Sequence, residues 1–189
     1  MNCNHCAEPL EDGTLVCPYC ATAQGPEQVQ LVLPVNRVTS LVSMVSCYAV
    51  FFDARLIIAY SSPELEAADL ERVRAECAAK GASPVKTNLA MMRRQANFYQ
   101  RYESMRADEI LPEDDRNGWL PYRQLARVEW QSAVVAPGSD DVPLVRREGE
   151  LALFDAEGNE IRFIHFQPHQ VAVKAVLERL FAFKLHYQR

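Results

Sequence analysis

Four cysteines near the N-terminus constrain the fold of this chain more than any other feature. They form two Cys-x-x-Cys pairs separated by ten residues, Cys3 with Cys6 and Cys17 with Cys20. Two thiolates on one tight turn reach the same ion, and a second turn across a short hairpin completes a tetrahedral four-cysteine shell. Such a shell has no open position for a substrate. The spacing therefore predicts one structural Zn²⁺ ion held by Cys3, Cys6, Cys17 and Cys20.

The alternative for these cysteines is two disulfides in a small secreted domain. The flanking sequence favours zinc, because residues 1–5 have neither a basic start nor an apolar core and we expect no signal peptide. Two more cysteines, Cys47 and Cys77, stand alone in apolar surroundings, as buried reduced thiols do. We therefore expect a cytoplasmic protein. His5 could compete as a ligand, but four cysteines already fill the shell.

The second cysteine pair, Cys17-Pro18-Tyr19-Cys20, resembles the Cys-Pro-x-Cys knuckle of bacterial zinc ribbons, with Ala7 and Ala21 where those ribbons usually have glycine. The resemblance implies a zinc ribbon over residues 1–24, followed by a linker at 25–27. Many ribbons bind nucleic acid, but residues 1–24 contain three acidic and no basic residues, so a phosphate backbone would be repelled. A contact made by this ribbon is expected with a protein surface.

Composition bounds the rest of the chain. With 189 residues, of which 49% are hydrophobic, the chain is long enough for a ribbon and one domain with a real core. A net charge of −5 argues against a general binder of nucleic acid or anionic membranes. The longest uncharged apolar run, residues 38–52, is shorter than the roughly 20 residues of a membrane helix. We therefore expect no membrane insertion.

Hydrophobic periodicity predicts an α+β fold. Alternating or β-branched runs indicate strands at 28–33, 43–52, 55–60, 119–121, 125–132, 150–155 and 160–166. Ser62-Pro63 and Ser83-Pro84 indicate the starts of two helices, to about Lys80 and about Arg106, which would form an inserted hairpin at about 62–106. A final helix at about 168–185 is expected to bury Val171, Val173, Val176, Leu177, Leu180 and Phe181.

Several strings resemble the bacterial pleckstrin-homology-like (PH-like) domains. The segment 52–59 is similar to their T-D-x-R-L-I hairpin, 120–125 to their I-P-Y-x-x-I lead-in, and 151–163 to their L-x-L-x-x-x-x-G-x-x-x-x-F hairpin. This resemblance implies an antiparallel PH-like β-barrel or sandwich over residues 28–189, capped by the C-terminal helix and commonly non-catalytic. Relatives that bind lipid headgroups use clustered basic residues in the first hairpin, where this chain has only Arg37 and Arg55. Lipid-headgroup binding is therefore not expected.

The second inserted helix is the candidate partner surface. Residues 86–106 carry five basic residues against one acidic residue, with aromatic residues interleaved, and such a surface suits an acidic protein or a nucleic acid. The more ordinary alternative is that this helix and the acidic helix before it neutralise each other. The candidate binding residues are Arg93, Arg94, Phe98, Arg101 and Tyr102.

Catalysis is not expected. The spacing of the histidines His165, His169 and His186 would not place two of them on one ion. The sequence also has no motif typical of a Ser or Cys nucleophile and no glycine-rich phosphate-binding loop. The prediction is a non-catalytic protein-interaction or scaffolding module whose partner is another protein or a second copy. The alternative is a nucleic-acid-associated factor that uses the basic helix 86–106.

Overall fold

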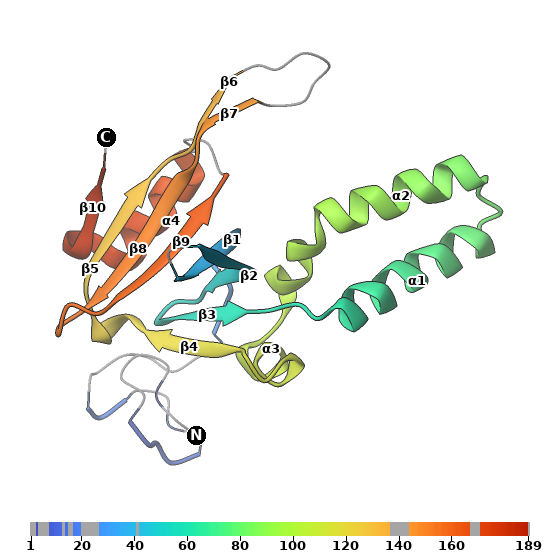
Figure 1. Cartoon of the computed structure of the whole chain (residues 1–189). Helices are drawn as coiled ribbons and strands as arrows, with labels where there is room; N and C mark the ends of the chain where they lie inside the picture. The colour runs from blue at the N-terminus through green and yellow to red at the C-terminus, as the bar shows by residue number, and fades with distance from the viewer. Residues whose placement is uncertain are drawn as a thin grey trace.

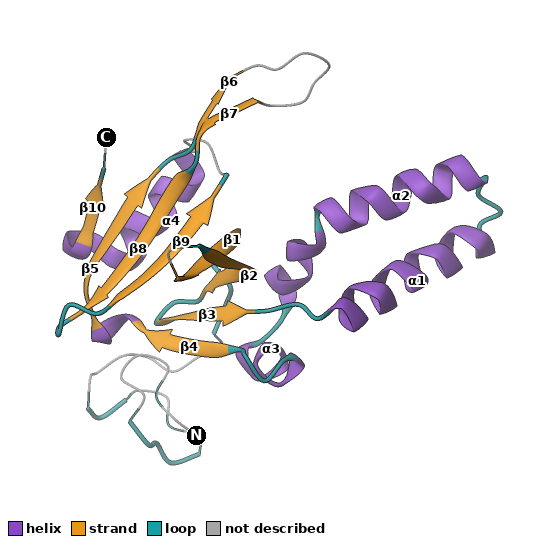
Figure 2. Cartoon of the chain, viewed as in Figure 1, coloured by secondary structure: helices purple, strands orange, loops and turns teal. Residues whose placement is uncertain are grey.

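The computed structural model describes residues 3, 8–12, 14, 17–19, 27–40, 42–136, 144–166 and 171–188. Eight strands form one sheet in the spatial order β10-β5-β8-β9-β1-β2-β3-β4. Their bounds are β1 (Leu31–Ser40), β2 (Ser43–Phe51), β3 (Arg55–Ala59), β4 (Gly118–Pro121), β5 (Leu125–Gln131), β8 (Gly149–Asp155), β9 (Glu160–His165) and β10 (Leu185–Tyr187). The predicted α+β class is confirmed (Figures 1 and 2).

The sheet is open and mixed, which differs from the predicted antiparallel barrel. Neighbouring strands are antiparallel except β10, which lies parallel to β5, and the outer strands β4 and β10 do not pair with each other in the described chain. Strand β1 pairs with β2 along its length but with β9 only at Asn36 and Arg37. Pro34, which has no N–H to donate, lies in the half of β1 that extends beyond β9.

The main core lies between the two parts of the sheet and the C-terminal helix α4 (Val171–Phe181). Val173, Leu177 and Phe181 recur every four residues and are buried, and the Phe181 ring packs edge-on against Tyr122 at 4.8 Å between centroids. Val171 was expected in this core, but it is exposed because it lies two positions away from that row on the first turn.

A second core lies on the other face of β1 to β3. The segment after the helical hairpin covers this face with η1 (Phe98–Ser104), α3 (Ala107–Ile110) and η2 (Leu111–Glu113). Phe98, Tyr102 and Ile110 are buried there against Val50 and Ile57 of the sheet. These strands are therefore covered on both faces, which explains why their sequences read as nearly continuous apolar runs.

The inserted helical hairpin consists of α1 (Pro63–Ala79) and α2 (Pro84–Ala96), as predicted from the two Ser-Pro starts. Ser62 caps α1 by accepting a hydrogen bond from the Leu65 amide at 3.1 Å. The second helix was predicted to continue to Arg106, but it ends at Ala96. Asn97 caps it with a side-chain bond to the Arg93 carbonyl at 2.9 Å, and the chain turns into η1 to bury Phe98 and Tyr102.

Short elements complete the fold. A separate two-stranded ribbon pairs β6 (Val134–Ala136) with β7 (Leu144–Arg147), and single turns form η3 (Tyr122–Gln124) and η4 (Ala182–Lys184). Residues 137–143, between β6 and β7, and the start predicted for the last helix, at 168, lie outside the described residues. Among the described helices, none combines the length and apolar character that crossing a bilayer requires.

Candidate functional site

The described part of the predicted zinc site brings two of the four cysteines together. Cys3 and Cys17 are both buried and share a small cluster with Leu10. The Cys3 amide donates to the Glu8 carbonyl at 2.8 Å, which closes the chain back on itself just after the first cysteine pair. The other two predicted ligands, Cys6 and Cys20, lie outside the described residues.

This arrangement fits a zinc ribbon as far as it is described. Two thiol side chains that lie 14 positions apart meet in one buried cluster, as two knuckles around one ion require. Within the residues that the structure describes, no three potential metal ligands gather in one place. The four-cysteine shell and its Zn²⁺ ion therefore remain a prediction.

Of the candidate partner-binding residues, Arg94 holds the hairpin together. It reaches from α2 to the buried carboxylate of Asp69 on α1, with Nε 2.5 Å from Oδ2 and Nη2 3.0 Å from Oδ1. Hydrogen bonds from Arg94, and then from Arg72, hold the pKa of Asp69 below its ordinary value. A guanidinium that is engaged by a buried carboxylate serves the packing of the two helices, as the more ordinary alternative predicted.

Three other candidates belong to the core beneath the hairpin. Phe98 and Tyr102 are buried against the sheet, so they are not part of an accessible surface, contrary to the sequence-based prediction. Arg101 pairs with Glu113, and its guanidinium lies over the Phe98 ring at 5.2 Å. Helical spacing predicts that these residues continue α2, with their rings on its surface. In the structure they belong to η1, which packs the rings against the sheet.

Arg93 is the one candidate that the structure leaves on the surface. It is exposed on α2 beside Lys86, and neither forms an ion pair with any residue that the structure describes. An apolar row runs along α2 beside them, and the sequence already places Leu89 and Met92 at helical spacing. Val85, Leu89 and Met92 are 78%, 46% and 68% exposed. Their spacing of four and then three residues places them on one face of the helix, but it does not tell whether that face is covered.

This row lies on an element that projects from the domain. Figures 1 and 2 show α1 and α2 side by side, extending away from the sheet as a two-helix arm. No residue of α2 is buried, and on α1 only Asp69 is. An apolar helix face on a projecting arm is typical of a surface that another element covers.

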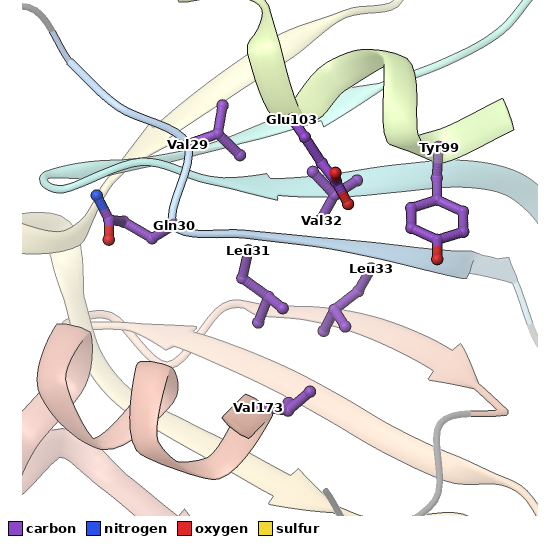
Figure 3. A pocket seen from close by; sticks show the side chains of 8 residues that line it. All are labelled: Val29, Gln30, Leu31, Val32, Leu33, Tyr99, Glu103 and Val173. Carbon is purple, nitrogen blue, oxygen red and sulfur yellow. The ribbon is translucent and has the colours of Figure 1, made fainter. Parts of the chain in front are cut away.

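A groove of about 460 Å³ follows the start of β1, between η1 and α4. Figure 3 shows Val32 beside Glu103 and Tyr99 on one side of the strand, whereas Leu31 and Leu33 point toward Val173. Glu103 is the only acidic side chain among the lining residues, and none is basic. The lining residues that the structure describes therefore include no pair of a carboxylate with a basic side chain.

A wider crevice of about 650 Å³ lies at the base of the hairpin, next to η1. Arg72, Arg94 and Arg101 line it, but each is paired with a carboxylate, Asp69 for the first two and Glu113 for the third. The crevice is consequently a junction of structural ion pairs and offers no uncompensated cation among the described residues.

The two basic residues of the first strand hairpin are also engaged. Arg55 pairs with the nearly buried carboxylate of Glu27, and its guanidinium lies 5.5 Å from the centre of the half-exposed Trp119 ring. Arg37 donates to the Tyr60 hydroxyl at 3.1 Å. The Arg55 pair joins β3 to the segment before β1, and the Arg37 bond joins β1 to the residue that follows β3, so both cations serve the structure.

The histidines do not form a site. His165 is fully buried on β9 and stacks on Trp130 at 4.1 Å between ring centroids, whereas His186 is exposed on β10 and His169 lies outside the described residues. Burial lowers the pKa of His165 to about 4, so this ring is neutral at pH 7. His165 is therefore a core residue.

The cysteines outside the ribbon differ from each other. Cys47 is buried, and desolvation raises the pKa of its thiol to about 11, which keeps it protonated and unreactive. Cys77, which was also expected to be buried, is only half-buried on α1 because the two-helix arm has no third layer to cover it.

Comparison with known proteins gives no relative for this arrangement. No protein family matches the chain, and no curated protein or solved structure matches it either.

Proposed function

We propose that this protein is a non-catalytic interaction or scaffolding module whose contact element is the α1–α2 arm. The observation that carries the proposal is the exposed row of Val85, Leu89 and Met92 on α2. A solvated row of three large apolar side chains is costly to leave uncovered, whereas covering a Leu or Met side chain contributes about 1.5–3 kcal/mol. Binding of another protein element to the row would supply that contribution.

The way the arm is held supports the same function. Its two helices are joined through the Arg94–Asp69 pair and half-buried side chains, and α2 buries none of its own residues. Most helical stability in proteins comes from packing an amphipathic face. Because α2 buries none of its residues, we propose that its apolar face packs on another protein element. A projecting, lightly packed arm suits a contact element.

The remainder of the chain supports the arm in this proposal. We propose a PH-like domain for residues 28–189. Strands β1 to β4 form one antiparallel meander in the sheet, and β5, β8 and β9 form a second. They meet where β9 returns to β1, and α4 packs between them. The zinc ribbon would be a second, rigid contact element. Its test is native mass spectrometry, where one Zn²⁺ per chain is expected, and Cys17→Ser should remove it.

The experiment that tests the arm compares two exposed apolar changes in the full chain. Leu89→Glu combined with Met92→Glu introduces charge into the row, whereas Val42→Glu introduces charge at a still more exposed apolar residue on the β1–β2 turn. We expect the double variant to lose the proteins, or the additional copies of this chain, that co-purify with the wild type from its native cells. Val42→Glu should retain them, and circular dichroism should show both variants folded. Equal recovery with both variants would refute the proposal.

The alternative function, a nucleic-acid-associated factor, makes a different prediction. Among the five basic residues of 86–106, Arg94, Arg101 and Arg106 pair with carboxylates, which leaves Lys86 and Arg93. Binding through two phosphate contacts would be weak and would depend modestly on salt. Tight binding of DNA or RNA that falls steeply with salt and is lost in Arg93→Ala would favour this alternative.

A further inference from the structure

We propose that the element that covers the α2 row is the α1 helix of a second copy of this chain. The outer face of α2 in one copy packs against the outer face of α1 in the next. This inference rests on the proposed function of the arm and names its partner. It follows from three features of the two helices: the direction of their outer faces, the size of the side chains there, and their charges.

The apolar row of α2 points away from α1. Val85, Leu89, Met92 and Ala96 recur at intervals of four, three and four residues and all are exposed, so they share one face of the helix. The partly buried residues Thr87, Met91 and Arg94 lie on the opposite face, and Arg94 is bonded to α1. The row is therefore the outer edge of the arm.

The outer face of α1 is shaped to receive such a row. Its exposed residues on the face away from α2 are Glu64, Glu71, Ala75 and Ala78, with Ala68 at the rim of the crevice beside Arg94, whereas Asp69, Val73 and Cys77 turn toward α2. Alanines allow a second helix to approach closely, and larger apolar side chains from that helix fill the space above them. A row of large apolar residues on one helix thus matches a row of alanines on the other.

The charges of the two faces are complementary. Helix α2 carries three basic residues and no acidic ones, whereas α1 carries five acidic residues and two arginines. Lys86 and Arg93 on α2 and Glu64 on the outer face of α1 form no ion pair with any described residue, and Glu71 on that face pairs with the exposed Arg74 of its own helix. Contact of α2 with a second α2 would oppose like charges, whereas contact with α1 pairs opposite ones.

The direction of the two faces fixes the kind of assembly. They lie on opposite edges of the arm, so a contact between α2 of one copy and α1 of the next is head-to-tail. Each added copy leaves one face of each kind uncovered unless a ring closes. We therefore expect rings or short chains of copies. The mean number of copies should increase with protein concentration and exceed two.

Two charge-reversed variants test this contact. Glu64→Lys with Glu71→Lys makes the outer face of α1 basic, and Lys86→Glu with Arg93→Glu makes α2 acidic; all four side chains are exposed. Light scattering after size-exclusion chromatography, at low salt and over a range of concentrations, gives the mass. We expect each variant alone to self-associate about tenfold more weakly than the wild type, because α2 then opposes a like charge on α1. An equimolar mixture should restore assembly, because each α2 then meets an oppositely charged α1.

Each contrary outcome is informative. A wild-type chain that stays monomeric at the highest concentration overturns the inference, as does a mixture that fails to restore the mass of the wild type. Self-association that persists in both single variants overturns it too. If the wild type is monomeric but its arm still captures a different protein that Leu89→Glu with Met92→Glu releases, the partner named here is wrong and the proposed function stands.

Discussion

Helices α2 and α4 have similar lengths and similar amphipathic patterns, but only α4 buries its apolar row. The apolar row of α4, at Val173, Leu177 and Phe181, is buried in the main core. The corresponding row of α2, at Val85, Leu89 and Met92, is exposed on a projecting arm. An amphipathic pattern therefore predicts that another element packs on the apolar face of a helix. It does not tell whether that element belongs to the same chain.

Among the changes considered, Gly149→Ala should lower the stability of the well-packed part of the sheet, around β5, β8 and β9, the most. A Cβ at this position would lie 2.2 Å from Cε1 of His165 and 2.7 Å from the backbone nitrogen of Ala133 and oxygen of Gln131. Backbone atoms cannot yield as a flexible side chain does, so we expect a loss of about 3–5 kcal/mol in the free energy of unfolding or failure to fold. Urea unfolding followed by circular dichroism measures it.

The matched control is Gly118→Ala, where a Cβ meets nothing within 4 Å. It should change the free energy of unfolding by less than about 1 kcal/mol. Similar losses in both variants would mean that the close packing of β5, β8 and β9 around Gly149 is not the cause.

His165 should make the same region sensitive to acid. The folded-state pKa of about 4 lies below the ordinary value of 6.5, so the unfolded chain binds the proton first as pH falls. The stability contributed by the neutral ring is fully present above pH 6.5 and is lost as pH falls through about 4. The loss is on the order of 3 kcal/mol. It is measured by urea unfolding between pH 7 and pH 4.

The control for this prediction is His165→Phe, which keeps a ring against Trp130 but cannot titrate. Carboxylates with lowered pKa values, such as Asp114 and Asp155, add their own acid sensitivity in both proteins. The difference between the two pH profiles therefore isolates His165. Parallel profiles over pH 6.5 to 4 would show that its titration does not govern stability.

Two buried tyrosines should respond oppositely to removal of their hydroxyl groups. The Tyr122 hydroxyl donates to the Phe52 carbonyl at 2.9 Å, so Tyr122→Phe should cost about 1–2 kcal/mol by leaving that buried carbonyl without its donor. The Tyr102 hydroxyl, beneath the arm, has no hydrogen-bond partner among the described residues. Tyr102→Phe should therefore be neutral or stabilise by about 1 kcal/mol. Thermal unfolding of both variants checks the pair, and equal losses would contradict it.

How much the sequence predicted depends on whether the signal was local. Ser62-Pro63 and Ser83-Pro84 placed the starts of both arm helices because caps and proline act within one turn. The end of α2 was missed by ten residues, because burial of Phe98 and Tyr102 against distant strands ends the helix there. Strand β10 was missed as well, since three residues carry too short a pattern and its pairing with β5 is long-range.

The candidate site divides in the same way. Cysteine spacing predicts a shared zinc ion without knowledge of the fold, and Cys3 and Cys17 lie in one buried cluster with Leu10, while the ion itself stays a prediction. The partner surface could not be predicted so directly, because Arg94 and Arg101 find their carboxylates only once the arm and η1 are in place. Spacing along α2 places Val85, Leu89 and Met92 on one face of the helix, but their exposure follows only from the fold, in which α2 lies on a projecting arm.

The smallest effect is expected at the arm itself. Leu89→Glu should change the free energy of unfolding of the dilute monomer by less than about 0.5 kcal/mol, because its side chain is 46% exposed and belongs to neither of the two core clusters of the domain. Leu177→Ala, at the matching position of the α4 row, should cost about 2–5 kcal/mol. Urea unfolding of both, at a concentration too low for self-association, measures the contrast. A loss above about 1 kcal/mol in Leu89→Glu would mean that α2 packs on its own domain in solution. A negligible loss would mean that the domain gains nothing from the apolar character of this row, which then has to be accounted for by what the arm binds.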